Sequence, residues 1–227
     1  MAAALWFVLL LRFRLTPDLD LAVARRFFDA AACAASRHET WCSGFPYGAV
    51  PALVFIRELL HPVPAMIGIV IAVMLAVELW MGKRWNEAGV RLKAVLVSSL
   101  VLGPGLVVNG VLKTYWGRPR PWMTEDFGGW LSFVEAGTRT DLCAANCSFV
   151  SGEAAVAGWL MCLALLLAVR RNVWAALVVG AVSVVMAGLR VVFGAHYFSD
   201  AVLAYWMTVA IFLVLAALAE FSVRRTR

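Results

Sequence analysis

The sequence predicts an all-α membrane protein built as a bundle of six transmembrane helices. The 227-residue chain is 63% hydrophobic and 15% charged, whereas a soluble domain is about half apolar and a quarter charged. Its apolar residues come in stretches close to the roughly 20 residues that a helix needs to cross a bilayer. No alternation of period two runs along these stretches, which argues against a β-barrel.

Six apolar segments give the expected helices, at residues 3–15, 62–81, 92–112, 148–169, 173–193 and 198–220. The first segment is short and carries Arg12 and Arg14. It is open to three interpretations: a short span with snorkelling arginines, a signal-type segment, or a chain whose true start lies upstream of Met1. We favour the span. In the third segment, Gly-Pro-Gly at 103–105 predicts a kinked or loosened helix.

The segments form one membrane domain over residues 1–227, and no separate soluble domain is expected. The connection at 16–61 is too long to be a bare loop. Two of its stretches, DLDLAVARRFFDAAACAA and VPALVFIRELL, predict helices lying in the membrane interface, within the first extracytoplasmic loop.

Basic residues predict the orientation, because short cytoplasmic loops collect lysine and arginine. They follow the second, fourth and sixth segments, as Lys83, Arg84, Arg91, Lys93, Arg170, Arg171, Arg224, Arg225 and Arg227. Both termini are therefore expected in the cytoplasm, in a bacterial-type inner (plasma) membrane. The net charge of +6 alone would also suit a nucleic-acid-binding protein, but nothing else supports such a partner.

Cysteine positions test this orientation. Cys33, Cys42, Cys143 and Cys147 fall in two loops on the predicted outer face, and Cys162 falls within a span. Four cysteines on an oxidising face suggest two disulfides, whose pairing the sequence does not give. The alternative is free thiols without a role.

Three polar clusters fall at the same predicted end of the bundle, on the extracytoplasmic side. They are KTYWGRPRP at 113–121, CSFVSGE at 147–153 and GLRVVFGAHYFSD at 188–200. Side chains far apart in sequence can therefore share one pocket.

The chemistry of such a pocket points to phosphate. Lysine and arginine supply up to four positive charges, and the planar guanidinium suits phosphate oxygens. The Ser-Gly-Glu stretch opens a helix, where free N–H groups favour an anion. If residues 196–200 are helical, His196 and Asp200 share a face. Asp200 would then accept a hydrogen bond from one imidazole nitrogen and leave the other free to attack. These features describe phosphoryl transfer through a phosphohistidine, stabilised by the cations.

Two spacings carry a family resemblance. Lys113 and Arg120-Pro121 fit K-x6-R-P, and Arg190, His196 and Asp200 fit R-x5-H-x3-D. These resemble the first and third signatures of the type 2 phosphatidic acid phosphatase superfamily, which includes bacterial lipid phosphatases and vanadium haloperoxidases. The resemblance covers roughly residues 60–220.

The resemblance implies a role for each matching residue. Lys113, Arg120 and Arg190 would bind phosphate, His196 would be the nucleophile and Asp200 its orienting partner. Ser151 and the backbone of Gly152 would hold a phosphate oxygen. Arg118 also precedes a proline, but its spacing from Lys113 differs, so we expect it to support the site from behind.

The chain departs from the family pattern at two positions. Leu189 replaces the serine that usually precedes the arginine of the third signature. Glu153 replaces the histidine of the second signature, which in the family protonates the leaving oxygen. Glu153 could be a general acid whose carboxyl group becomes protonated when phosphate binds, could recognise a cationic group of the substrate such as an amino sugar, or could mark a loss of activity.

The expected function is metal-independent hydrolysis of a phosphate ester or diphosphate on a lipid head group. Candidate substrates are lipid A-type glycolipid phosphates, isoprenyl phosphates, phosphatidate and phosphatidylglycerol phosphate. The alternatives are lipid-to-lipid phosphotransfer and non-catalytic binding or transport of lipid phosphates. No metal or cofactor is expected, since no His, Cys or carboxylate set has ligand spacing. His38 and His61 have no evident partners and are expected at the surface. The sequence does not indicate an oligomeric state.

Overall fold

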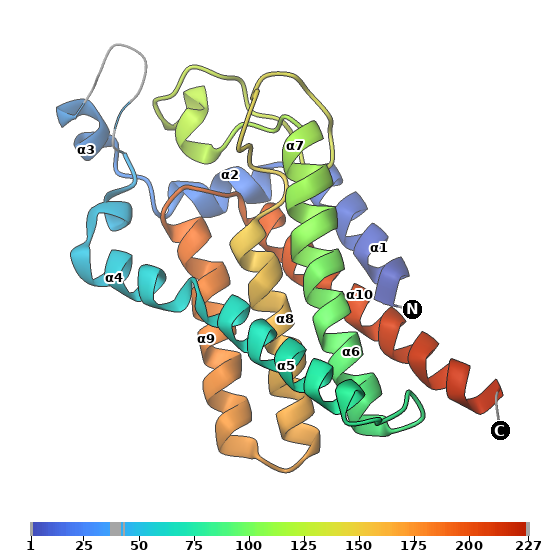
Figure 1. Cartoon of the computed structure of the whole chain (residues 1–227). Helices are drawn as coiled ribbons and strands as arrows, with labels where there is room; N and C mark the ends of the chain where they lie inside the picture. Colours follow the sequence, from blue (N-terminus) through green and yellow to red (C-terminus); the bar gives the residue numbers. More distant parts are fainter. Residues whose placement is uncertain (1, 37–41, 43, 226–227) are drawn as a thin grey trace.

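The computed structural model describes residues 2–36, 42 and 44–225, and every regular element within these ranges is helical (Figure 1). The predicted all-α class is therefore confirmed. The long helices run side by side, and the long loop that follows α7 lies at one end of the bundle.

Within the described residues, five helical stretches are long and apolar enough to cross a membrane. The first joins α4 (Pro51–Leu60) to α5 (Val63–Trp80), and the second joins α6 (Ala88–Leu100) to the turns that end at Tyr115. The other three are α8 (Gly152–Val169), α9 (Val173–Val192) and α10 (Phe198–Arg225). Five of the six predicted segments thus have the expected form.

The first segment is a helix, α1 (Ala2–Leu15), of 14 residues. At 1.5 Å per residue it is about 21 Å long, shorter than the roughly 30 Å of a bilayer core. It packs along α10, where the Trp6 indole donates to the Leu203 carbonyl (2.9 Å) and the Trp206 indole donates to the Ala2 carbonyl (3.1 Å). Its crossing of the membrane stays a prediction.

The predicted distortion at Gly-Pro-Gly is confirmed. Residues Val101–Leu112 form a wide π-helical stretch with Pro104 inside it, followed by the short α7 (Lys113–Tyr115). Since Pro104 has no N–H and its ring crowds the preceding turn, the helix widens here. The Asn109 side chain donates to the Pro104 carbonyl (2.7 Å), which satisfies one of the disturbed backbone groups.

The first long loop contains the helices expected of it: α2 (Asp18–Arg25), α3 (Ala30–Ala35) and α4, with a 3₁₀ turn at Pro46–Ala49. In Figure 1, α2 lies across the end of the bundle. Its contacts are with protein, since α2 packs against α10 and buries Asp20 and Ala24.

The four loop cysteines form the disulfides Cys33–Cys42 and Cys143–Cys147. The first bond lies against Gly128, which ends a 3₁₀ turn of the second long loop, Glu125–Phe127. It therefore closes a turn of the first loop and packs that loop against the second. Cys162 is a buried free thiol in α8.

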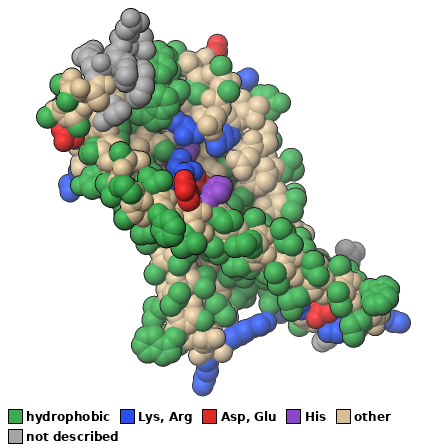
Figure 2. Space-filling view, turned by 60° about the vertical axis from the view of Figure 1, so that its left-hand side comes forward, with side chains coloured by type: hydrophobic (Ala, Val, Ile, Leu, Met, Phe, Trp, Pro, Cys, Tyr) green, Lys and Arg blue, Asp and Glu red, His purple; other side chains and the backbone are tan. Residues whose placement is uncertain are grey.

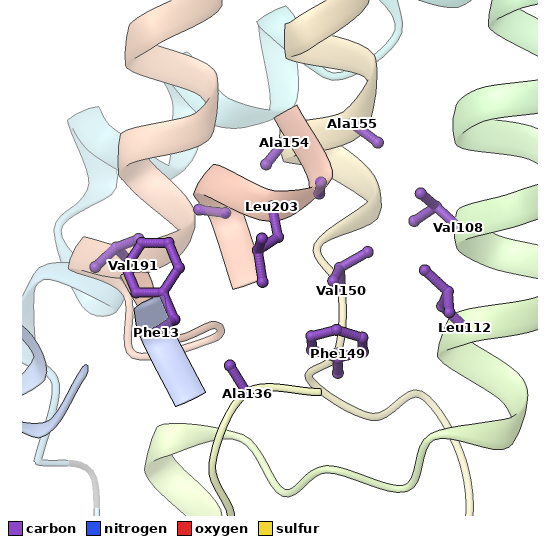
Figure 3. Close-up of a cluster of buried hydrophobic side chains, with 12 residues drawn as sticks. Phe13, Val108, Leu112, Ala136, Phe149, Val150, Ala154, Ala155, Val191 and Leu203 are labelled. Carbon is purple, nitrogen blue, oxygen red and sulfur yellow. The ribbon is translucent and has the colours of Figure 1, made fainter. Parts of the chain in front are cut away.

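A buried apolar cluster lies directly beneath the second loop (Figure 3). Phe149 and Val150 pack between Val108 and Leu112 of the π-helical stretch and Leu203 of α10. Phe149 and Val150 are at most 1% exposed. The chain on either side of them, which includes Ser148 and Ser151, is thus held firmly at the end of three helices.

Candidate active site

The C-terminal end of α9 places Arg190 and His196 next to each other. Gly194, with φ +63°, donates to the Val191 carbonyl, and Ala195 donates to the Arg190 carbonyl (3.1 Å). These bonds form a Schellman motif, in which a left-handed residue, usually glycine, ends the helix. The His196 N–H also donates to the Arg190 carbonyl (3.1 Å). The five residues between Arg190 and His196 therefore form this helix ending, which brings the two residues together.

The N-terminal end of α10 explains the spacing from His196 to Asp200. Tyr197 precedes the first helical residue, and Asp200 is the third residue of the helix. Its Oδ2 accepts a hydrogen bond from the Tyr197 N–H (3.1 Å). This is the backward bond of a capping box, in which an acidic residue at the third position caps the helix.

The imidazole of His196 is oriented by Ser148. Nδ1 lies 2.8 Å from the Ser148 carbonyl oxygen. Because a carbonyl can only accept, Nδ1 carries the proton and Nε2 keeps a free lone pair. The expected direct hydrogen bond to Asp200 is wrong: within the described chain, no hydrogen bond or ion pair joins these two side chains. His196 lies before α10 begins, so the helical register that would align the two residues is absent.

Asp200 reaches the histidine indirectly. Its Oδ2 accepts a hydrogen bond of 2.5 Å from the Ser148 hydroxyl, and Ser148 in turn holds the imidazole through its carbonyl. The other oxygen, Oδ1, pairs with Arg118 at 2.6 Å. Asp200 thus fixes the residue that orients His196.

Arg118 is at the centre of a fully buried polar network. Its side chain is 0% exposed and lies between Asp200 and Asp20, which accepts from it at 2.8 Å. Asp20 also accepts from the Ser199 N–H (2.8 Å) and hydroxyl (2.5 Å). Complete burial lowers the pKa of Arg118, but Asp200 and Asp20 more than offset this and the pKa is raised. Arg118 therefore stays charged and supports the site from behind.

The other predicted cations, Lys113, Arg120 and Arg190, lie within electrostatic range of His196. Asn146 holds Arg120 through its carbonyl and its side-chain oxygen, both at 2.8 Å. Lys113 lies within electrostatic range of Arg120 and Arg190. The Nε of Arg190 is buried and has no hydrogen-bond partner among the described residues. Three cations close to one another, one of them with an unpaired buried N–H, make a site suited to an anion.

Burial and the neighbouring cations favour the neutral form of His196. Burial, followed by the positive charges of Arg120 and Arg190, lowers the pKa of His196 well below its ordinary value of 6.5. The hydrogen bond to Ser148 opposes this only in part. A neutral imidazole with a free Nε2 is the form needed for nucleophilic attack.

Ser151 and Gly152 begin α8 beside this cluster. Ser151 is the N-cap, and its hydroxyl accepts from the Ala154 N–H (3.3 Å). Its own N–H donates to the Asp200 carbonyl (3.3 Å), which joins the starts of α8 and α10. Gly152 is the first helical residue, whose N–H has no partner within the helix.

Glu153 is engaged by residues that sequence reasoning missed. Arg57 of α4 forms a two-point pair with it, at 2.6 Å and 3.1 Å. Arg190 lies 3.5 Å from Glu153 Oε1, and the Nδ1 of His61 lies 3.9 Å from the same oxygen. His61 is exposed, as expected, but it lies at the site. His38 is outside the described residues. Figure 2 shows basic, acidic and histidine side chains gathered in a hollow on this face.

A weak signal marked two of the missed residues. Arg57 interrupts the apolar face of VPALVFIRELL, and Asp20 interrupts that of DLDLAVA. Charges at such positions can indicate buried pairs. Ser148 and Asn146 each contribute a backbone carbonyl and a side-chain oxygen, and neither residue carried a signal in the sequence. Within the described ranges, no three His, Cys, Asp or Glu side chains form a group that could hold a metal.

Comparisons with known proteins identify the family of this chain. The model of the PAP2 superfamily matches residues 92–224. A lipid A 4′-phosphatase of Rhizobium leguminosarum is 41% identical over 95% of this chain and 94% of its own length. Lipid A 4′-phosphatases of Rhizobium etli and Francisella tularensis subsp. novicida are 41% and 34% identical, over 95% and 84% of this chain and 84% and 81% of their own lengths. No solved structure matches significantly.

Proposed function

The chain belongs to the PAP2 superfamily, and from this premise we propose that it removes the 4′-phosphate of a lipid A-type glycolipid by way of a phosphohistidine. The observation that carries the proposal is the neutral His196, with Nδ1 bound to a carbonyl and Nε2 free, beside Lys113, Arg120 and Arg190. The curated relatives named as lipid A 4′-phosphatases support the choice of substrate.

In the first step, His196 Nε2 attacks phosphorus, the bond from phosphorus to the sugar oxygen breaks, and that oxygen takes up a proton. Lys113, Arg120 and Arg190 stabilise the charge on the phosphoryl oxygens, and the Ser151 hydroxyl and Gly152 N–H add two donors. In the second step, water attacks phosphorus, the nitrogen–phosphorus bond breaks and inorganic phosphate leaves. No metal takes part, since the cationic side chains supply the positive charge.

We propose further that the site faces the extracytoplasmic side of a bacterial inner membrane, with both termini in the cytoplasm. Two disulfides lie at the site end of the bundle, and disulfides persist in oxidising compartments. Lys83, Arg84, Arg170 and Arg171 lie between spans at the other end, as the positive-inside rule requires of cytoplasmic loops.

The test is phosphate release by the purified protein in detergent. The substrates are lipid A with both phosphates, an isoprenyl diphosphate, phosphatidate and phosphatidylglycerol phosphate, each with and without EDTA. We expect free phosphate from lipid A, loss of the 4′-phosphate by mass spectrometry, and no effect of EDTA. His196→Ala is expected to abolish release. Release from none of the four lipids, phosphate retained on a second lipid, or full activity of His196→Ala would contradict the proposal.

A further inference from the structure

The leaving oxygen needs a proton, and the ion pairs of Glu153 make it a poor donor. Two nitrogens of Arg57 and one of Arg190 lie 2.6 to 3.5 Å from its carboxyl oxygens. Opposite charges at such distances favour the ionised form of a carboxyl group. Glu153 is also the second residue of α8, where the helix dipole favours negative charge. A carboxylate held in this way accepts hydrogen bonds and does not donate them.

His61 is a proton-bearing group placed beside this carboxylate. It caps α4, and its N–H donates to the Arg57 carbonyl (2.9 Å). Residues four apart lie on the same side of a helix, so Arg57 and His61 both reach Glu153 Oε1. Arg190 contacts the same oxygen, which places His61 next to a phosphate-binding side chain.

The side chain of His61 is exposed, so a substrate that enters the site can contact it. Its side chain is 59% exposed, whereas that of Glu153 is 14% exposed. The 3.9 Å from Nδ1 to Glu153 is longer than a hydrogen bond, and catalytic hydrogen bonds often shorten only when substrate binds. With Nδ1 turned to Glu153, Nε2 faces away from the carboxylate and is free to contact the leaving oxygen.

We propose that His61 is the general acid of this enzyme and that Glu153 positions it. This inference rests on the proposed phosphatase function. As His196 attacks phosphorus and the ester bond breaks, the proton on His61 Nε2 passes to the sugar oxygen, which leaves as an alcohol. Water then attacks the phosphohistidine and gives its proton back to His61 Nε2. The imidazole from α4–α5 thus performs the proton transfer that the second-signature histidine performs elsewhere in the family.

The experiment compares His61→Gln and Glu153→Gln with Glu58→Gln, a control that removes an exposed carboxylate from the same helix as Arg57. For each variant, kcat and KM are measured on the lipid phosphate that the wild-type protein cleaves. General acid catalysis contributes about 10²- to 10⁴-fold, so His61→Gln is expected to lower kcat by about that factor with KM nearly unchanged. Glu153→Gln is expected to lower kcat less, because His61 remains, and Glu58→Gln should match wild type.

Two further measurements separate proton donation from a structural role. Inhibition by inorganic phosphate should be unchanged in His61→Gln, because the cations that bind phosphate are intact. A long-chain aryl phosphate, whose phenolate leaves without a proton, should lose much less rate in His61→Gln than an alkyl phosphate does.

A normal kcat in His61→Gln, or a loss of rate only in Glu153→Gln, would overturn the assignment and return the acid role to Glu153. Equal losses on aryl and alkyl phosphates would also overturn it. Either result leaves the phosphatase function intact, whereas a wild-type protein that releases no phosphate refutes the function itself.

Discussion

Arg118 and Arg120 are two residues apart, each precedes a proline, and the structure predicts opposite consequences of replacing them. Arg118 lies between Asp20 and Asp200 and is fully buried. Among the described residues, Arg120 donates hydrogen bonds to Asn146 alone, and it lies within electrostatic range of Asp200 and Glu153, which attract it, and of Arg57, which repels it. We expect Arg118→Leu to reduce stability and Arg120→Leu to reduce phosphate binding.

The size of each effect follows from these partners. Removing the cation from a buried pair leaves an uncompensated charge and costs about 3–5 kcal/mol, and Arg118→Leu leaves two such carboxylates. For a chain of this size that corresponds to a fall in Tm of roughly 6–20 °C. Arg120→Leu loses two hydrogen bonds and the attraction of Asp200 and Glu153 but removes a cation from a site it shares with other cations, so its Tm should stay within about 4 °C of wild type. Losing a charged hydrogen bond to substrate, about 1.5–3 kcal/mol, lowers kcat/KM about 10- to 150-fold.

The assay is thermal unfolding in detergent followed by tryptophan fluorescence, with kcat/KM measured on the same preparations. Arg118→Lys keeps the charge but fewer of the hydrogen bonds, so its Tm should lie between those of wild type and Arg118→Leu. If Arg118→Leu does not accumulate, Arg118→Lys provides the test. Arg139→Leu is the control, because Arg139 is exposed and, within the part of the chain that the structure describes, donates a hydrogen bond to the Tyr115 carbonyl alone. The reasoning is refuted if both Arg118 variants melt within about 4 °C of wild type, or if Arg120→Leu melts as low as Arg118→Leu.

Two further predictions concern pH and the first disulfide. Burial and the charges of Arg120 and Arg190 lower the pKa of His196 well below 6.5, so His196 stays neutral as the pH falls through 6.5. The fall of kcat/KM at acid pH that is due to protonation of His196 should therefore occur well below pH 6.5. Arg120→Leu removes one of these charges and should move this fall in kcat/KM to higher pH. A fall caused by ionisation of the substrate would not move, so an unchanged pH profile contradicts the role given to His196. Cys33→Ser opens a disulfide of sequence separation 9 and should cost about 2.5 kcal/mol in free energy of unfolding. Reducing agent opens both disulfides, so it should lower the Tm of the wild-type protein at least as far as Cys33→Ser does. An unchanged Tm in Cys33→Ser would contradict a stabilising role for this bond.

Much of the site could be predicted from sequence because its spacings are local backbone motifs. The distance from Arg190 to His196 is set by a Schellman ending, and Asp200 is placed by a capping box. Both motifs involve residues within one or two turns, so sequence distance translates directly into spatial distance. The apolar spans were equally predictable, since burial in lipid requires long hydrophobic runs.

Contacts between distant segments could not be predicted in the same way. Arg57 meets Glu153 across 96 residues, and Asp20 meets Ser199 across 179. Such pairs depend on how whole helices pack, and a single sequence does not encode that directly. The error at Asp200 has a related cause: its spacing from His196 is helical, but the helix begins only at Phe198.

The site uses different arginines for two tasks, the stabilisation of the fold and the binding of phosphate. A cation paired with a carboxylate attracts phosphate less strongly than an unpaired cation does. Arg118 is paired and buried, whereas Arg120 has its hydrogen bonds with the neutral Asn146. Glu153 is the exception, because this carboxylate lies among the phosphate-binding cations and weakens the attraction of Arg190 for phosphate. A role for Glu153 in holding His61 at the leaving oxygen gives a physical reason for a negative charge at that position.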